Sequence, residues 1–171
     1  MRVAVYGLGN VLMLDDGFGP SAVRRLEAAW AFGEDVELVD LGTPGLDLPS
    51  KILDLDLLVF LDVVSAKDDP GTMCTFDKDA LLEKAPAGRR QTTHEAGIRE
   101  ALWTADLMGR GPKSAVLIGV VPKVVASGTG LSPEVERAID PACRRVVEVL
   151  AAHGYEGAPR EVPAATGAWW E

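Results

Sequence analysis

The stretch of residues 56–64, with the sequence DLLVFLDVV, limits the fold more than any other part of this chain of 171 residues. From Leu57 to Val64, Asp62 is the only residue that is not apolar. A strand that is apolar on both faces is typical of the centre of a parallel sheet, where helices cover each side. The stretch therefore predicts a central strand of an α/β protein.

Strand-like and helix-like segments alternate along the rest of the chain. Short apolar or β-branched runs bounded by glycine or proline predict strands at residues 3–8, 36–41, 56–64, 72–76 and 114–121. Apolar positions at helical spacing, together with capping signals, predict helices at residues 19–30, 46–53, 95–108 and 133–153. We expect the strand at 72–76 at a sheet edge, and Ser132 as the cap of the last helix.

This alternation predicts a single domain over residues 1–156, with an α/β fold. We expect three layers, α/β/α, around a twisted and mostly parallel sheet of about five strands. Residues 157–171, GAPREVPAATGAWWE, lack periodicity and predict a flexible C-terminal tail. Trp169 and Trp170 either belong to this unstructured end or dock a partner.

Charge and composition exclude several classes of partner. The net charge of −9 disfavours nucleic acid, which needs a basic face, and anionic membrane surfaces. Apolar runs are too short to span a bilayer, and the N-terminus carries no signal-peptide pattern. Cys74 and Cys143 stand in no metal-binding spacing, which indicates reduced thiols. We therefore expect a cytoplasmic protein whose acidic surface favours a monomer.

Polar residues gather where the predicted strands end. Asp15 and Asp16 follow the first strand, Asp62 ends the central strand, and His94 precedes a helix. Ligands of open parallel sheets bind beyond the carboxyl ends of the strands, and an unpaired charge among apolar neighbours is costly. Two carboxylates and an imidazole form a metal-ligand set. The alternative is ordinary capping, with acids at a helix start or a strand end.

A nucleotide site is a competing interpretation of the first glycine turn. GLGNVL supplies the first two glycines of a dinucleotide fingerprint, but Leu12 stands at the third position. Asp40 lies 31 residues after Gly9, whereas the ribose-binding acid comes roughly 20 residues on. Asp15 and Asp16 would repel a pyrophosphate. A nucleotide- or metal-binding α/β module without protease activity remains the alternative function.

Five motifs, in this order, resemble one known family. GLGNVLMLDDGFG, DLGTPG, LDVVSAKDDPGTM, TTHEAG and LIGVVP are similar to the motifs of the nickel–iron hydrogenase maturation endopeptidases. The resemblance covers residues 1–156. It implies a metal-dependent, aspartyl-type endopeptidase, which removes the C-terminal extension of a hydrogenase large-subunit precursor after nickel has been inserted.

The resemblance also implies roles for particular residues. Asp16, Asp62 and His94 correspond to the family's metal-recognition set, and we expect them to be both catalytic and metal-binding. The nickel is then supplied by the partner, the large-subunit precursor, and an open three-ligand site reads whether it is present. We expect Asp15 to support the helix start or to orient Asp16.

Two loops are expected to contact the substrate. Gly42, Thr43 and Gly45 form a candidate docking loop for the cleavage segment, and Arg89 and Arg90 are candidates for steering an acidic segment. The chain has no Gly-x-Ser-x-Gly elbow, neither cysteine lies near a histidine in sequence, and the motifs contain one histidine, which disfavours a covalent mechanism. The His-Glu-x-x-His helix of zinc proteases is also missing from the sequence. An autonomous metallohydrolase with tightly held zinc is the third hypothesis.

Overall fold

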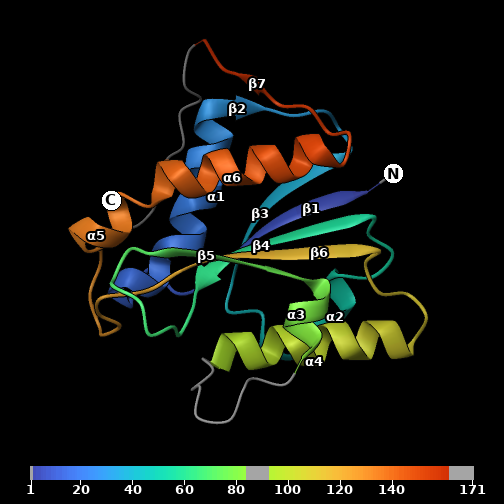
Figure 1. Cartoon of the computed structure of the whole chain (residues 1–171), viewed down its shortest axis with the longest axis horizontal. Helices are drawn as coiled ribbons and strands as arrows, with labels where there is room; N and C mark the ends of the chain where they lie inside the picture. Colours follow the sequence, from blue (N-terminus) through green and yellow to red (C-terminus); the bar gives the residue numbers. More distant parts are fainter. Residues whose placement is uncertain (1, 84–92, 162–171) are drawn as a thin grey trace.

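A five-stranded sheet with the order β3-β1-β4-β6-β5 forms the middle of the molecule (Figure 1). The structure is a computed structural model that describes residues 2–83 and 93–161. Four strands are parallel and β5, at one edge, runs antiparallel to β6. The strands are β1 (Val3–Leu8), β3 (Val36–Gly42), β4 (Leu57–Val63), β5 (Met73–Asp77) and β6 (Ser114–Val120). The predicted α/β fold and the edge position of β5 are confirmed.

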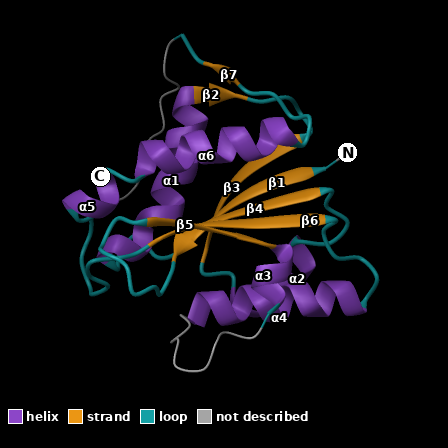
Figure 2. Cartoon of the chain, in the orientation of Figure 1, coloured by secondary structure: helices purple, strands orange, loops and turns teal. Residues whose placement is uncertain are grey.

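Helices cover both faces of the sheet, which gives three layers (Figure 2). On one face lie α1 (Phe18–Ala29) and α6 (Ile139–Ala152). On the other face lie α2 (Leu48–Lys51), α3 (Lys78–Leu82) and α4 (Thr93–Leu107). Short turns of helix complete the chain: η1 (Leu14–Gly17), η2 (Gly45–Asp47) and α5 (Pro133–Glu136).

Each face of the sheet has its own hydrophobic core, because neighbouring residues of a strand point to opposite sides. Val5 and Val59 pack on the α1 and α6 side, whereas Tyr6 and Phe60 pack on the side of α2 and α4. Every residue of β4 is buried, and β4 pairs with β1 and β6. The predicted central strand is therefore confirmed, and its apolar faces account for both layers of helices.

Glycines let the start of α1 lie directly against the ends of two strands. A Cβ atom on Gly19 would lie 2.2 Å from the carbonyl oxygen of Leu8 and 2.3 Å from that of Leu61. A Cβ atom on Gly7 would lie 2.5 Å from the carbonyl oxygen of Gly19. No other residue fits at these contacts without displacing backbone. The contacts bring η1, just before α1, next to the end of β4.

The predicted final helix at residues 133–153 is in fact two helices, α5 and α6. The break follows from Pro141, in the first turn of α6. Proline has no N–H to donate to the carbonyl four residues earlier, that of Arg137, and its ring would clash with that carbonyl in a continuous helix. The chain therefore leaves the helix after Glu136 and starts again at Ile139.

The predicted tail begins with paired backbone. Within residues 157–171, β7 (Ala158–Pro159) pairs antiparallel with β2 (Trp30–Ala31), which directly follows α1. The backbone N–H of Arg160 also donates to the carbonyl of Ala29 over 2.8 Å. Trp169 and Trp170 lie outside the described residues, as do Arg89 and Arg90, and the domain limit at residue 156 stays a prediction.

Candidate metal-binding and catalytic site

The three predicted site residues come together at one edge of the sheet. The order of the strands reverses between β1 and β4, and ligands of open α/β sheets bind in the crevice at such a point. Asp16 lies in η1 after β1, Asp62 near the end of β4, and His94 in the first turn of α4. One side-chain atom of each lies within 4.8 Å of the others. Spacing of this kind suits shared contact with one ion.

Within this trio, His94 stands between the two carboxylates. Its Nδ1 atom lies 3.3 Å from Oδ1 of Asp62 and 3.8 Å from Oδ1 of Asp16. The side chain of Asp62 is only 1% exposed and that of Asp16 12%, whereas the His94 side chain is 24% exposed. His94 therefore forms the accessible side of the trio, and Asp62 forms its floor.

Asp62 is a buried carboxylate with an unsatisfied oxygen. Its Oδ1 accepts the backbone N–H of Val63 over 2.7 Å, but its Oδ2 has no hydrogen-bond partner in the described part of the chain. Burial raises the pKa of Asp62 to about 6, against the opposing effect of the His94 hydrogen bond. The same hydrogen bond raises the pKa of His94, although burial acts the other way. An unpartnered anionic oxygen beside an imidazole is the donor chemistry that a divalent cation would satisfy.

The first glycine turn positions Asp16. Gly9 has a φ of 130°, and a Cβ atom there would lie 1.8 Å from the carbonyl oxygen of Asp16. The backbone N–H of Asn10 donates to Oδ2 of Asp16 over 2.8 Å, which leaves Oδ1 on the His94 side. The glycine turn thus cradles a carboxylate of the chain itself. Sequence reasoning missed the part that the Asn10 amide plays.

Asp15 connects η1 to a segment far along the chain. It is fully buried, and it accepts hydrogen bonds from the backbone N–H groups of Lys123, Val124 and Ser132 over 2.6 to 3.0 Å. Burial works to raise the pKa of Asp15, but these hydrogen bonds outweigh it and hold the pKa below the ordinary value. Asp15 makes no capping hydrogen bond to α1, and whether it orients Asp16, its neighbour in η1, stays a prediction. Asp15 ties η1 to the segment after β6.

Ser132 takes part in the same contact. It stands at the N-cap position of α5, as predicted, but its side chain makes no capping hydrogen bond. Its hydroxyl lies 3.0 Å from Oδ2 of Asp15 and donates to it. The partners of Asp15 lie 108 to 117 residues further along the chain, so no local pattern in the sequence pairs them.

The candidate docking loop borders a pocket beside the trio. The pocket has a volume of about 220 Å³, and its lining includes Gly42, Thr43, Gly45 and His94. A second pocket of about 220 Å³ shares Gly42 and Thr43 and extends to Asp40. The docking segment therefore lies between two hollows at the carboxyl edge of the sheet. Asp40 itself accepts the N–H of Gly42 and stands outside the trio.

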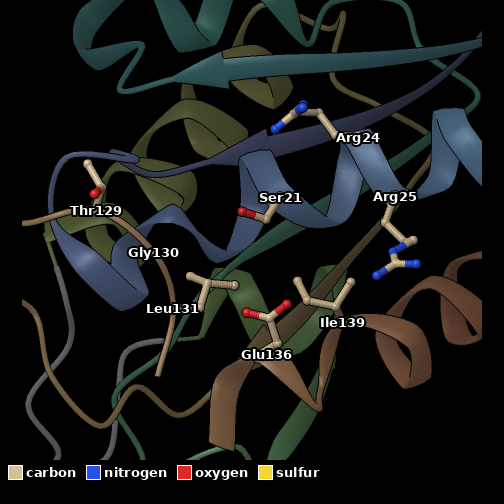
Figure 3. Close-up of a pocket in the computed structure, with 8 residues that line it drawn as sticks. All are labelled: Ser21, Arg24, Arg25, Thr129, Gly130, Leu131, Glu136 and Ile139. Atoms are coloured by element: carbon tan, nitrogen blue, oxygen red, sulfur yellow. The ribbon is translucent and has the colours of Figure 1, made fainter. Parts of the chain in front are cut away.

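A larger pocket, of about 360 Å³, lies elsewhere. Figure 3 shows Ser21, Arg24 and Arg25 of α1 on one side of it, and Glu136 and Ile139 on the other. The Arg24 side chain points away from Glu136, and Arg25 forms an ion pair with Asp140. No member of the trio lines this pocket, so its size does not mark the site of the chemistry.

Fold and trio together define a class of protein: an α/β protein with a candidate divalent-cation site, open to solvent at one histidine, at the switch point of its sheet. None of the helices in the described ranges has the length and apolar content needed to cross a bilayer.

Comparison with known proteins identifies the family. Residues 20–149 match the family model described as hydrogenase maturation protease. The hydrogenase 2 maturation protease of Escherichia coli K12 is 35% identical over 164 residues, which cover 94% of this chain and 98% of that protein. The HupD hydrogenase expression/formation protein of Thiocapsa roseopersicina is 35% identical over 94% of this chain and 72% of its own length. The chain belongs to the hydrogenase maturation protease family.

Solved structures agree with this assignment. The hydrogenase maturating endopeptidase HybD of E. coli superposes with a TM-score of 0.85 at 33% identity, and the match covers 94% of this chain and 98% of that one. The [NiFe] hydrogenase maturation protease HybD of Thermococcus kodakarensis gives a TM-score of 0.70 at 28% identity, with 87% and 99% covered. The predicted family, hydrolase class and endopeptidase function are confirmed, in preference to a binding module without protease activity.

Proposed function

We propose that this endopeptidase removes the C-terminal extension of a nickel–iron hydrogenase large-subunit precursor, and that Asp16, Asp62 and His94 recognise the nickel that the precursor carries. The observation that carries the proposal is the convergence of the three side chains within 4.8 Å of one another. The unpartnered Oδ2 of Asp62 supports it, since this buried oxygen lacks a donor in the described part of the chain.

The proposed site recognises a metal that belongs to the substrate. Carboxylate oxygens and an imidazole nitrogen are ligands that divalent transition metals accept. Three protein ligands leave positions open in the coordination shell, as catalytic metal sites do. The remaining ligands then come from the precursor, so the shell is complete only when nickel has already been inserted. Cleavage would thereby follow metal insertion.

The proposed catalytic roles belong to the same three residues. When bound, the ion supplies polarisation of the scissile carbonyl or of a water molecule. The imidazole of His94 holds Asp62 in place through the contact of 3.3 Å. In the aspartyl-type mechanism proposed here, the carboxylate of Asp16 or Asp62 accepts the proton of the attacking water. No nucleophilic side chain of the protease is required.

We also propose that the chain works as a cytoplasmic monomer. The proposal is supported by the net charge of −9, which disfavours loose self-association, and by the cysteine pattern, which is typical of reduced thiols.

The test is incubation of the purified protein with nickel-loaded and nickel-free large-subunit precursor, followed by mass spectrometry. We expect a loss of mass only in the nickel-loaded precursor. His94→Ala and Asp16→Ala should stop processing while the fold is retained. His153→Ala is the matched control, because His153 lies at the end of α6, outside the trio, and its imidazole contacts the Val149 carbonyl of its own helix. Normal processing by both site variants would rule the proposal out.

Metal analysis separates this proposal from an autonomous metallohydrolase. A site completed by the substrate should hold little metal in the freshly purified protein. Stoichiometric zinc in that protein would instead favour a hydrolase of small substrates.

A further inference from the structure

Gly97 is a helix residue that the protein's own structure does not explain. It lies in α4, three residues after His94, and therefore on the same face of the helix. Glycine inside a helix costs roughly 0.5–1 kcal/mol relative to alanine. Gly97 does not have the positive φ found at Gly9 and Gly42. A Cβ atom at Gly97 would meet nothing within 4 Å among the described residues.

The missing side chain leaves space in the pocket beside the trio. Gly97 lines the 220 Å³ pocket, together with Leu8, Pro44 and Leu48. An apolar cavity of roughly 150 Å³ is known to hold a benzene molecule, so this pocket has room for one amino-acid side chain. A leucine at position 97 would project into the same space.

The chemistry of the lining selects an uncharged occupant. Leu8 and Leu48 are buried, at 3% and 4% exposure, and among the described residues of the lining only His94 is ionisable. A charged group placed against Leu8 and Leu48 would lose hydration without gaining a partner from these side chains. Because His94 also belongs to the trio, whatever fills the pocket lies directly beside the candidate metal ligands.

We propose that this pocket receives an apolar side chain of the substrate residue next to the scissile bond, and that Gly97 sets the size of side chain accepted. The inference rests on the proposed function, since it takes the trio to be the place of cleavage. A peptide bond presented to Asp16, Asp62 and His94 brings a neighbouring side chain to the pocket that His94 lines. Gly97 is then a specificity-determining residue.

The test compares Gly97→Ala and Gly97→Leu with the wild-type protein on the nickel-loaded precursor. Both variants should fold with an unchanged or higher melting temperature, because each replaces a helix glycine at a position where the new Cβ atom meets nothing within 4 Å. Gly97→Leu should lower kcat/KM by about 10- to 200-fold, and Gly97→Ala by less. Thr104→Leu is the matched control. It adds leucine at an exposed position of the same helix, outside the pocket, and should cut at the wild-type rate.

A compensating change in the substrate distinguishes specificity from a general loss of structure. Mass spectrometry of the wild-type products locates the cut bond, and the two residues that flank it are then shortened to alanine in turn. One of these precursors should be cut by Gly97→Leu faster than the original precursor is. Aspartate at that same position should block cutting by the wild-type protein.

Two results overturn the inference in different ways. In the first case the wild-type protein cuts the precursor, but Gly97→Leu either cuts it equally fast or cuts neither shortened precursor faster than the original. The pocket assignment then fails, while the proposed function stands. If the wild-type protein leaves the nickel-loaded precursor intact, the proposed function fails and the pocket assignment fails with it.

Discussion

The two ends of the central sheet treat their carboxylates in opposite ways. At the amino end, Asp54 forms an ion pair with Arg110, and Asp56 pairs with Lys113 over 2.6 Å. At the carboxyl end, Asp16 and Asp62 each accept one backbone N–H and lie beside the imidazole of His94, and Oδ2 of Asp62 has no partner in the described ranges. The carboxylates of Asp54 and Asp56 at the amino end are therefore paired with cations, whereas Asp62 at the carboxyl end keeps an oxygen available for a ligand.

This difference distinguishes exposed ion pairs from a buried carboxylate that has a free oxygen. Exposed ion pairs such as those at the amino end contribute little to folding, because water already screens and solvates their charges. A buried carboxylate without a full set of partners weakens the folded state. Its presence at the end of β4 is therefore better explained by binding than by stability. Replacing Asp62 should consequently raise stability and abolish activity, whereas replacing an ion-paired acid at the amino end should change both only slightly.

The largest expected effect is the loss of cleavage in Asp62→Asn. This substitution removes the charge but keeps the shape, so processing of the nickel-loaded precursor should fall by a factor of about 10³ or more. The unfolded-state pKa lies near 3.8 and burial raises the folded-state value to about 6. Ionisation of Asp62 therefore destabilises the fold as the pH rises through this window, and the variant should gain on the order of 1–3 kcal/mol at pH 7.

Urea unfolding and cleavage assays check both halves of this prediction. Asp54→Asn, the same substitution at the opposite end of the sheet, is the control and should cut normally. An Asp62→Asn protein that is less stable and still active would contradict the conclusion that Asp62 serves binding rather than stability.

The next effect in size concerns stability at the carboxyl end. Asp15→Ala removes the acceptor of three backbone N–H groups and one hydroxyl, so the segment after β6 keeps only backbone hydrogen bonds to η1 among those described. We expect a loss of about 3–5 kcal/mol in the free energy of unfolding, because four hydrogen bonds to a buried charged acceptor are lost. Asp56→Ala, at the exposed end, should be far milder. Equal losses for the two variants would show that Asp15 has no special structural role.

The fold was predictable because it depends on local patterns. The apolar run of β4 and the alternation of elements specify a parallel sheet with helices on both faces. The trio was predictable because the resemblance pointed to Asp16, Asp62 and His94, and because the carboxyl ends of parallel strands meet at one edge. The structure brings these residues together, while their catalytic and metal-binding roles stay predictions.

What could not be predicted depends on backbone groups far apart in the chain. Every residue but proline has an N–H, so nothing in the sequence marks the amides of Lys123 and Val124 as partners of Asp15. The pairing of β7 with β2 could not be predicted either, because strands of two residues have no periodicity in the sequence. The break before α6 is different, because Pro141 marks it locally in the sequence.

The smallest expected effect is that of Arg110→Ala at the amino end. The hydrogen bond from Arg110 holds the pKa of Asp54 below its ordinary value of 3.8, so any stabilisation by the pair is present at neutral pH and disappears as the pH falls through this range. Both side chains are about half exposed, so water screens the pair. We expect a melting temperature indistinguishable from wild type at pH 7 in high salt, where screening is strongest. A clearly lower melting temperature under these conditions would mean that the exposed ion pair at the amino end contributes to stability after all.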